Sequence, residues 1–272
     1  MPELPEVETV RRTLEPAILG RAVTRVLVHR GDVVRGLRGS SRGATLLEGD
    51  RVRETARLGK QLALIGESGR VVLVHLGMTG RMVVRDDSPL AHTHVEWKLE
   101  DGTRVAFADA RRFGGLWTYA SVEELHARRW NMLGPDALSV RSDQLARRLG
   151  KTRRPIKAAL LDQGVLAGVG NIYADEALFL AKIGPRTRAD TLAPERVRDL
   201  ARAIRRVLYD ALRARGTTLR DYVDARGQRG DAGPTLRAYA RAGLPCVRCG
   251  QTLKGTRITQ RTTTYCPDCQ RP

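Results

Sequence analysis

The spacing of apolar residues predicts a helix at the start of the chain. Within the first twenty residues, apolar side chains recur at intervals of three and four, at Val7, Val10, Leu14 and Ile18. Pro5 and the acidic residues around it suit the first turn of a helix, where the backbone dipole is positive. Gly20 ends the pattern. We therefore expect an amphipathic helix that begins within a few residues of the chain terminus.

From Arg21 to about Ala120 the apolar period changes to two, which is typical of strands. The predicted strands are Ala22–Val28, Arg51–Ile65, Arg70–Leu76, Arg81–Val84, His94–Leu99 and Arg104–Phe107. Asp101-Gly102 is a strong hairpin turn between two of them. This region predicts an antiparallel β-sandwich with the first helix attached.

Near Arg129–Pro135 the spacing of apolar residues changes again, from the period of two to the spacing of helices. The predicted helices are Ser142–Leu149, Pro155–Leu161, Asn171 to about Ala181, and Ala193–Arg215. A glycine-rich stretch, Thr217–Pro234, predicts a long loop. The expected fold is α+β, with a β-sandwich domain over residues 1–130, a helical domain over 131–235 and a cysteine-bearing segment over 236–272.

The net charge of the chain narrows the class of molecule that it is expected to bind. The chain has 48 basic and 30 acidic residues, a net charge of +18, and 42 of the basic residues are arginine. Such a surface favours nucleic acid, because the arginine fork matches phosphate oxygens. An arginine-rich composition with no special partner is the alternative. Aromatic residues are only 4% of the chain, which argues against an anionic membrane surface, and no apolar run reaches the length of a membrane span.

All four cysteines lie near the end of the chain, in two CxxC pairs separated by sixteen residues: Cys246, Cys249, Cys266 and Cys269. This spacing is typical of a zinc ribbon with four thiolate ligands. Two disulfides are the alternative. Because the acidic N-terminus lacks the apolar stretch of a signal peptide, we expect the cytoplasm and reduced thiols. Between the pairs, Thr256–Tyr265 has strand character and contains Arg261, which a zinc-held hairpin would present.

Two further features could carry chemistry. Pro2 follows Met1, and a small second residue favours removal of the initiator methionine, which would leave a secondary amine. An α-amino group has a pKa of about 8, so roughly a tenth of it is free base at pH 7. Such an amine can attack an electrophilic carbon and form a cationic iminium, with Glu3 as acid or base. An ordinary chain start is the alternative. Asn171 begins a helix after a glycine turn, which suits either phosphate binding or a plain structural turn.

Together these motifs resemble the formamidopyrimidine-DNA glycosylase family. The resemblance rests on Pro2-Glu3-Leu4-Pro5-Glu6-Val7-Glu8, Gly59-Lys60, His75-Leu76-Gly77-Met78, Asp109-Ala110-Arg111-Arg112-Phe113-Gly114, Gly168-Val169-Gly170-Asn171-Ile172-Tyr173 and the cysteine pairs, in the same order over residues 2 to 269. Ala110 departs from the family pattern, which commonly has proline there. The start Pro-Glu-Leu-Pro is more similar to the oxidised-purine branch than to the endonuclease VIII branch.

The resemblance implies roles for individual residues. Pro2 would be the nucleophile, Glu3 the proton donor to the opening sugar, and Lys60 and Arg261 would assist catalysis at flanking phosphates. Further DNA contacts would come from His75, His92, Arg111, Arg153 and Asn171. Met78, Arg111 and Phe113 would fill the gap left by a flipped base, with Arg111 pairing to the orphaned cytosine. Residues 217–239 would form a lid.

The sequence therefore predicts a bifunctional DNA glycosylase and abasic-site lyase of base excision repair. It would excise 8-oxoguanine and formamidopyrimidines from double-stranded DNA and cleave the strand by β,δ-elimination, as a monomer with one structural Zn²⁺. The fold implied is the predicted sandwich, followed by a helix-two-turn-helix domain and a zinc-ribbon hairpin. An endonuclease VIII-like enzyme for oxidised pyrimidines and a non-catalytic nucleic-acid-binding zinc-ribbon protein are the alternatives.

Overall fold

The structure is a computed structural model that describes residues 1–35, 46–86 and 90–271. The chain forms two compact units. The first contains residues 1–131 and 214–231, and the second contains residues 132–213 and 232–272. The predicted three-part division into residues 1–130, 131–235 and 236–272 stays a prediction.

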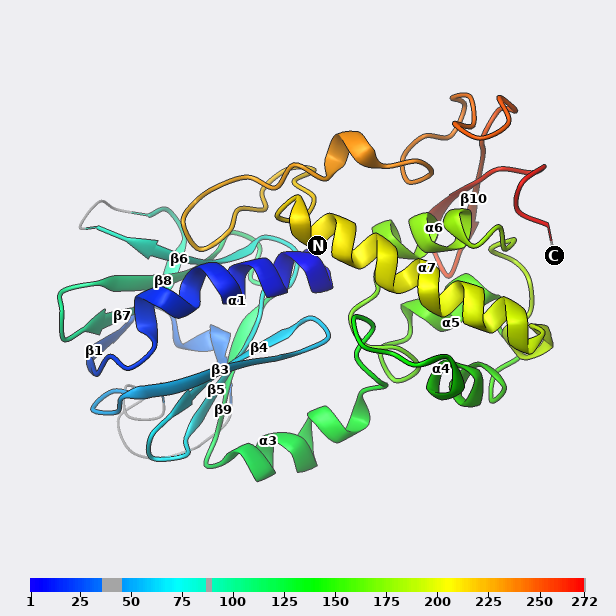
Figure 1. Cartoon of the computed structure of the whole chain (residues 1–272). Coiled ribbons are helices and arrows are strands. Elements are labelled where there is room, and N and C mark those ends of the chain that lie inside the picture. The colour runs from blue at the N-terminus through cyan, green and yellow to red at the C-terminus, as the bar shows by residue number, and fades with distance from the viewer. Residues whose placement is uncertain (36–45, 87–89, 272) are drawn as a thin grey trace. The chain divides into compact units, whose positions relative to one another are not determined.

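The first unit is a two-layer β-sandwich with helix α1 (Leu4–Ile18) packed along it (Figure 1). One sheet has the strand order β1-β7-β8-β6 and the other has the order β2-β9-β5-β4-β3. The bounds are β1 (Val23–Val28), β2 (Val34–Arg35), β3 (Val52–Leu58), β4 (Gln61–Gly66), β5 (Val71–His75), β6 (Gly80–Arg85), β7 (Thr93–Leu99), β8 (Arg104–Asp109) and β9 (Gly115–Tyr119). The predicted sandwich with a leading helix is confirmed, although β2 pairs with β9 in parallel.

One predicted strand is wrong in detail. The alternation over residues 51–65 predicts a single strand, but these residues form a hairpin of β3 and β4. Gly59 makes the reversal possible, because its φ of +58° lies in the left-handed region that glycine tolerates best. The turn leaves Lys60 between the two strands.

The apolar face of α1 closes the core of the sandwich. Its buried side chains join residues of both sheets in one cluster, which includes Val10, Leu14, Val74, Met82 and Phe107. The burial of this stripe explains why the helix forms at the chain start. It also fixes the first residues of the chain against the sandwich.

Helix α3 (Val122–Arg128) was not predicted, because it is short and carries a single buried apolar residue, Leu125. Its start is capped in both directions: the Glu124 amide donates to Ser121 Oγ at 3.3 Å, and the Ala120 amide donates to Glu124 Oε2 at 2.7 Å. Polar capping rather than periodicity defines this element.

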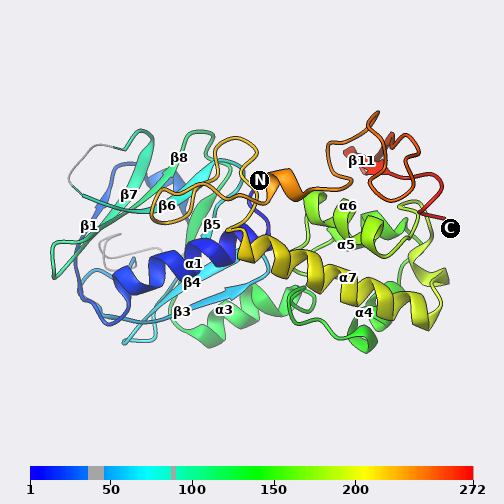
Figure 2. The same cartoon turned by 45° about the horizontal axis from the view of Figure 1, so that its top comes forward.

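The second unit is built on helices. They are α4 (Ser142–Leu149), α5 (Ile156–Leu161), α6 (Asn171–Leu180) and α7 (Pro194–Arg213), in agreement with the four predicted helices. Helix α6 is almost entirely buried, and α7 packs against it, as both views show (Figures 1 and 2). The helices thus place the start of α6, at Asn171, in a rigid setting.

The end of the chain adds a hairpin of β10 (Lys254–Ile258) and β11 (Arg261–Tyr265). The turn residues Thr259 and Gln260 have φ values of +47° and +60°, the combination of a two-residue hairpin turn. Arg261 is therefore the first residue after the turn. Among the described residues, none of the helices has the length and apolar character required to span a membrane.

Candidate active site and metal site

The start of the chain is buried next to a carboxylate that holds it in place. Pro2 is buried and Glu3 is 2% exposed, whereas Met1 is 51% exposed. The Glu3 amide donates to Glu6 Oε2 at 2.8 Å, as the capping box of α1. The other oxygen of the same carboxylate, Oε1, accepts from the Thr217 amide at 2.7 Å. Glu6 therefore links the chain start to residues 214–231.

Part of the predicted lid is anchored to α1 through the same region. The Tyr222 hydroxyl donates to the Glu6 carbonyl at 3.3 Å, and the Ala225 amide donates to Thr13 Oγ1 at 3.0 Å. Burial and the Glu6 charge raise the pKa of Tyr222, so its hydroxyl stays a neutral donor. The first half of residues 217–239 is thus fixed in the first unit, and their role as a lid stays a prediction.

A second carboxylate of α1 fixes the turn that carries Lys60. Glu8 Oε2 accepts from Arg57 Nε at 3.0 Å, and Arg57 Nη1 donates to the Gly59 carbonyl at 2.9 Å. Lys60 follows directly and is 8% exposed. Sequence reasoning singled out Lys60 but missed the positioning roles of Glu8 and Arg57, because the burial of a carboxylate is not visible in the sequence.

The Glu8 carboxylate is strongly acidic. Burial alone would raise its pKa, but hydrogen bonds from Arg11 and Arg12, and the charges of Arg11 and Arg57, lower it to about 2. Glu8 is therefore ionised at neutral pH, and its negative charge offsets three guanidinium groups around it.

His75 lies at the end of β5 as a neutral imidazole. Burial lowers its pKa to about 4, and the charges of Arg129 and Lys60 act in the same direction. Its Nδ1 accepts from the Gly77 amide at 3.1 Å. The proton of the neutral ring is therefore on Nε2, which leaves that atom as a hydrogen-bond donor.

Two touching loops carry the predicted gap-filling residues. Asp109, which is buried, accepts from the Gly114 amide at 2.7 Å and from Thr79 Oγ1 at 2.5 Å, and so ties the loop after β8 to the loop after β5. The loops approach so closely that a Cβ on Gly77 would lie 2.3 Å from the Gly114 amide nitrogen. Sequence reasoning missed Asp109 as the organising residue.

The side chains on these loops face solvent. Met78 is 40% exposed and Phe113 is 56% exposed. The Arg111 guanidinium lies over the Phe113 ring, with Cζ 4.5 Å from its centre. Core packing, the ordinary role of methionine and phenylalanine, therefore does not explain them. His92 is also exposed, and its φ of +62° positions its carbonyl to accept from the Asp109 amide at 3.1 Å.

In the second unit, the start of α6 is tied to the hairpin. Asn171 Nδ2 donates to Thr262 Oγ1 at 3.3 Å, and the fully buried Lys157 donates to the Thr262 carbonyl at 2.8 Å. Arg261 is exposed one residue earlier on β11. Asn171 and Arg261 are therefore neighbours through Thr262, whereas the side chain of Arg153 is 88% exposed and lies 4.0 Å from Asp190.

The four cysteines are gathered as a metal site requires. Their sulfur atoms all lie within 4.8 Å of one another, and Cys249 Sγ is 3.5 Å from Cys266 Sγ. Tetrahedral zinc with sulfur at about 2.3 Å separates its ligands by about 3.8 Å, so four thiolates at these distances fit Zn²⁺. None of the four is disulfide-bonded, which removes the alternative of two disulfides.

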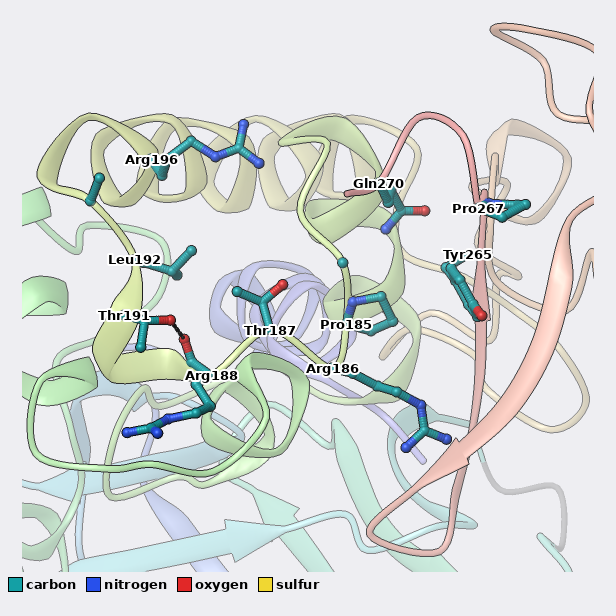
Figure 3. Close-up of a pocket in the computed structure, with 12 residues that line it drawn as sticks. Pro185, Arg186, Thr187, Arg188, Thr191, Leu192, Arg196, Tyr265, Pro267 and Gln270 are labelled. Atoms are coloured by element: carbon teal, nitrogen blue, oxygen red, sulfur yellow. Dashed lines mark hydrogen bonds between the residues drawn. The ribbon is translucent and has the colours of Figure 1, made fainter. Parts of the chain in front are cut away.

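A cavity of about 850 Å³ in the second unit is separate from these sites (Figure 3). It is lined by the loop before α7 and by the end of β11, and it includes none of the predicted site residues. The guanidinium groups of Arg186, Arg188 and Arg196 point in different directions in Figure 3 and do not converge on one position. Arg188 is already paired with Asp190 at 2.7 Å. The cavity is therefore lined by residues other than those of the candidate site.

Comparisons with known proteins cover almost the whole chain. Residues 1–116 match the formamidopyrimidine-DNA glycosylase N-terminal domain, residues 133–223 the H2TH domain of the same proteins, and residues 243–272 a zinc finger found in FPG and IleRS. A formamidopyrimidine-DNA glycosylase of Desulfitobacterium hafniense is 43% identical over 274 residues, 99% of this chain and 100% of the relative.

Solved structures agree with these matches. The MutM (FPG) protein of Thermus thermophilus is 39% identical, with a TM-score of 0.87 over 99% of this chain and 98% of that chain. A Lactococcus lactis FPG mutant, crystallised with DNA that contains Fapy-dG, is 30% identical, with a TM-score of 0.88 over the whole of both chains.

The metal site predicts a measurable dependence on zinc. Elemental analysis should find about one Zn²⁺ per chain, since four thiolates form one tetrahedral site. Cys249→Ser should unfold the ribbon and abolish DNA binding, while the first unit keeps its β-sheet circular dichroism signal. Retention of full DNA affinity in a metal-free sample would contradict this role.

The Glu8 network predicts how stability depends on pH. The folded-state pKa of about 2 lies below the ordinary value of 4.5, so Glu8 stabilises the fold above pH 4.5 and loses this effect as the pH falls through 2. The effect amounts to about 3 kcal/mol at most. In urea unfolding, the stability difference between the wild type and Glu8→Gln should shrink towards low pH. The exposed Glu54→Gln is the control. A difference that is constant with pH would refute the prediction.

Proposed function

The chain belongs to the formamidopyrimidine-DNA glycosylase family, and from this membership and the placement of its residues we propose how they divide the work of a DNA glycosylase and abasic-site lyase. The enzyme acts on oxidised purines in base excision repair. The observation that carries the division of roles is the burial of Pro2 and Glu3 at the capped start of α1.

Pro2 is the nucleophile. With Met1 attached, its nitrogen is an amide and inert, so Met1 must be removed; its exposure leaves it open to removal. The freed secondary amine attacks C1′ of the damaged nucleotide, and the bond from C1′ to the base breaks as the base leaves with a proton. The sugar ring opens when Glu3 protonates its oxygen, which leaves a cationic iminium on Pro2. Loss of the C2′ proton then permits β-elimination, and a second elimination follows.

Lys60 and His75 bind the backbone around the extruded nucleotide. Lys60 supplies a positive charge to phosphate and assists proton transfer. His75 donates one neutral hydrogen bond from Nε2, because its lowered pKa keeps it uncharged. Its contribution to binding is therefore independent of pH near neutrality. Phosphate contacts of this kind position the substrate without reading its sequence.

Met78, Phe113 and Arg111 fill the space that the flipped nucleotide leaves. The two apolar side chains are already exposed in the free protein, on loops fixed by Asp109. Their insertion offsets part of the few kcal/mol that unstacking costs. Arg111 is the residue that contacts the orphaned cytosine, and its stacking on Phe113 holds its guanidinium in place.

The second unit binds the backbone of the damaged DNA strand. Asn171 binds phosphate at the start of α6, and Arg261 contacts the phosphates flanking the lesion and assists the second elimination. Zn²⁺ supplies the fold of the ribbon, so Cys246, Cys249, Cys266 and Cys269 act through the position of Arg261. His92 and Arg153 add peripheral DNA contacts, which their exposure permits.

The substrate that we propose is double-stranded DNA with oxidised purines or abasic sites. We infer that the enzyme works as a monomer in the cytoplasm, associated with the nucleoid through its charge of +18.

Trapping with borohydride tests the nucleophile. The mature protein should form a stable adduct with abasic-site DNA through residue 2, and intact mass should show the loss of Met1. Pro2→Gly should be greatly impaired even though it retains a primary amine, because the cationic iminium of a secondary amine is lost. Peptide mapping that places the adduct on Lys60 would show the mechanism to be wrong.

The role of Arg111 is tested by how DNA affinity depends on the base opposite the lesion. A bidentate base contact is worth about 1–3 kcal/mol of discrimination, so Arg111→Ala should bind lesions opposite cytosine and opposite adenine with more similar affinity, at an unchanged salt slope. Lys60→Ala and Arg261→Ala should instead each lower the salt slope by about one ion. If Arg111→Ala lost affinity equally for all opposite bases and its slope fell, Arg111 would be a phosphate contact.

A further inference from the structure

Trp117 carries an unusual set of cationic neighbours. It lies on β9, between β5 and the short strand β2. The Arg129 guanidinium lies over its ring, with Cζ 4.8 Å from the ring centre, and Arg35 Cζ lies 5.3 Å from the same centre. The His75 imidazole meets the ring edge-on at 6.5 Å. Both guanidinium groups are within the range of a cation–π interaction.

Arg129 is delivered to this position by the residues around it. It directly follows α3, and its neighbour Trp130 is buried with its indole Nε1 donating to Gln61 Oε1 at 3.1 Å. Gln61 directly follows Lys60 and is the cross-strand partner of His75. A single buried hydrogen bond thus fixes the end of α3 beside the two residues that the proposed function assigns to phosphate.

Among the residues that the structure describes, no carboxylate balances the charge of Arg129. Within the described ranges, no acidic side chain forms an ion pair with it; its contact is the Trp117 ring. Its neighbour Arg128 differs, since its side chain is 72% exposed and pairs with Glu124 at 3.1 Å. The Arg129 and Lys60 charges both act on His75. Gathered cations repel one another in the free protein, and a polyanion relieves that repulsion.

We propose that Arg129, held on Trp117, is a further phosphate-binding residue, which extends the Lys60–His75 surface to a neighbouring phosphodiester of the DNA. Arg35 adds a second cation on the same ring. This proposal rests on the proposed function, because it takes Lys60 and His75 to be phosphate contacts. DNA is the occupant that fits, since its phosphates repeat along the strand and can meet adjacent cations one after another.

The aromatic ring explains why an arginine is used here. A guanidinium stacks on an aromatic face while its N–H groups remain directed outward, whereas a carboxylate partner would compete with phosphate for the same donors. Trp117 therefore holds the Arg129 side chain without neutralising it. It keeps the cation ordered before DNA arrives, which reduces the entropy lost on binding.

The test compares Arg129→Gln with Arg128→Gln, which removes the same charge one residue away. Binding is measured against salt concentration on a duplex that contains a tetrahydrofuran abasic analogue, which is not cleaved. Arg129→Gln should lower the slope of log K against log salt by about 0.9, the value for one phosphate contact, while Arg128→Gln should leave it unchanged. The single-turnover excision rate at saturating enzyme should be unchanged in the control Arg128→Gln.

A second measurement reports on the position of the Arg129 charge. In the free protein, the pKa of His75 measured by NMR titration should shift upward from about 4 in Arg129→Gln, because a nearby cation no longer opposes protonation. Arg128→Gln should leave the titration unchanged. Trp117→Leu should weaken DNA binding by about two- to fivefold with little change of slope, because the cation remains but is less ordered.

The outcomes separate this proposal from the function on which it rests. If Lys60→Ala lowers the salt slope and Arg129→Gln does not, Arg129 is no phosphate contact and the proposal is overturned. Equal slopes for Arg129→Gln and Arg128→Gln overturn it as well, because the loss would then reflect net charge alone. If Lys60→Ala also leaves the slope unchanged, the phosphate surface of the proposed function is wrong.

Discussion

Buried carboxylates must have hydrogen-bond donors, and this constraint positions the candidate site. On α1, Glu6 takes one donor from the chain start and one from Thr217, while Glu8 takes Arg57 from the strand before the Lys60 turn. An uncompensated buried charge costs several kcal/mol, so the segments that supply these donors are held close to α1. The helix therefore does more than close the core. It fixes Pro2, Glu3 and the turn that carries Lys60 from a single element.

Buried carboxylates that accept hydrogen bonds from other segments also occur on α6 in the second unit. Glu176 accepts from the backbone amides of Arg237, Ala238 and Tyr239 at 2.8 to 3.0 Å, where the chain enters the ribbon. Asp175 accepts from the Thr264 amide on β11 and pairs with the buried Lys157 at 2.7 Å. Burial raises the pKa of Asp175 to about 6, and the Lys157 charge opposes that rise. Two adjacent carboxylates thus hold the chain where it enters the ribbon and hold strand β11 of the ribbon hairpin.

Much of this architecture could be predicted from the sequence, and the exceptions share a physical reason. Periodicity indicated α1 and α7, because each buries an apolar stripe. A proline and a glycine turn marked the starts of α5 and α6, and the CxxC spacing indicated the metal site. Helix α3 and the organising role of Asp109 were missed, since both depend on hydrogen bonds between polar groups, which leave no periodic pattern. The roles of Met78, Phe113 and Arg111 came from the family resemblance alone. Taken singly, methionine and phenylalanine favour core packing, and the exposure of Met78 and Phe113 in the structure sets them apart.

Two features of the structure cost free energy in the free protein, and a binding partner accounts for both. Met78 and Phe113 expose apolar surface to water, and the charges of Arg129 and Lys60 both act on His75, with no carboxylate paired to Arg129 among the described residues. Folding alone would not select either arrangement, because apolar surface is more stable buried and cations are more stable apart. In the proposed function, a DNA duplex removes both costs together, since the gap left by an extruded base would take the apolar side chains while phosphates would take the cations. The rigid carboxylate anchors of α1 and the Asp109 loop make this possible. Asp109 holds the loops that carry Met78 and Phe113 against each other while no DNA is bound.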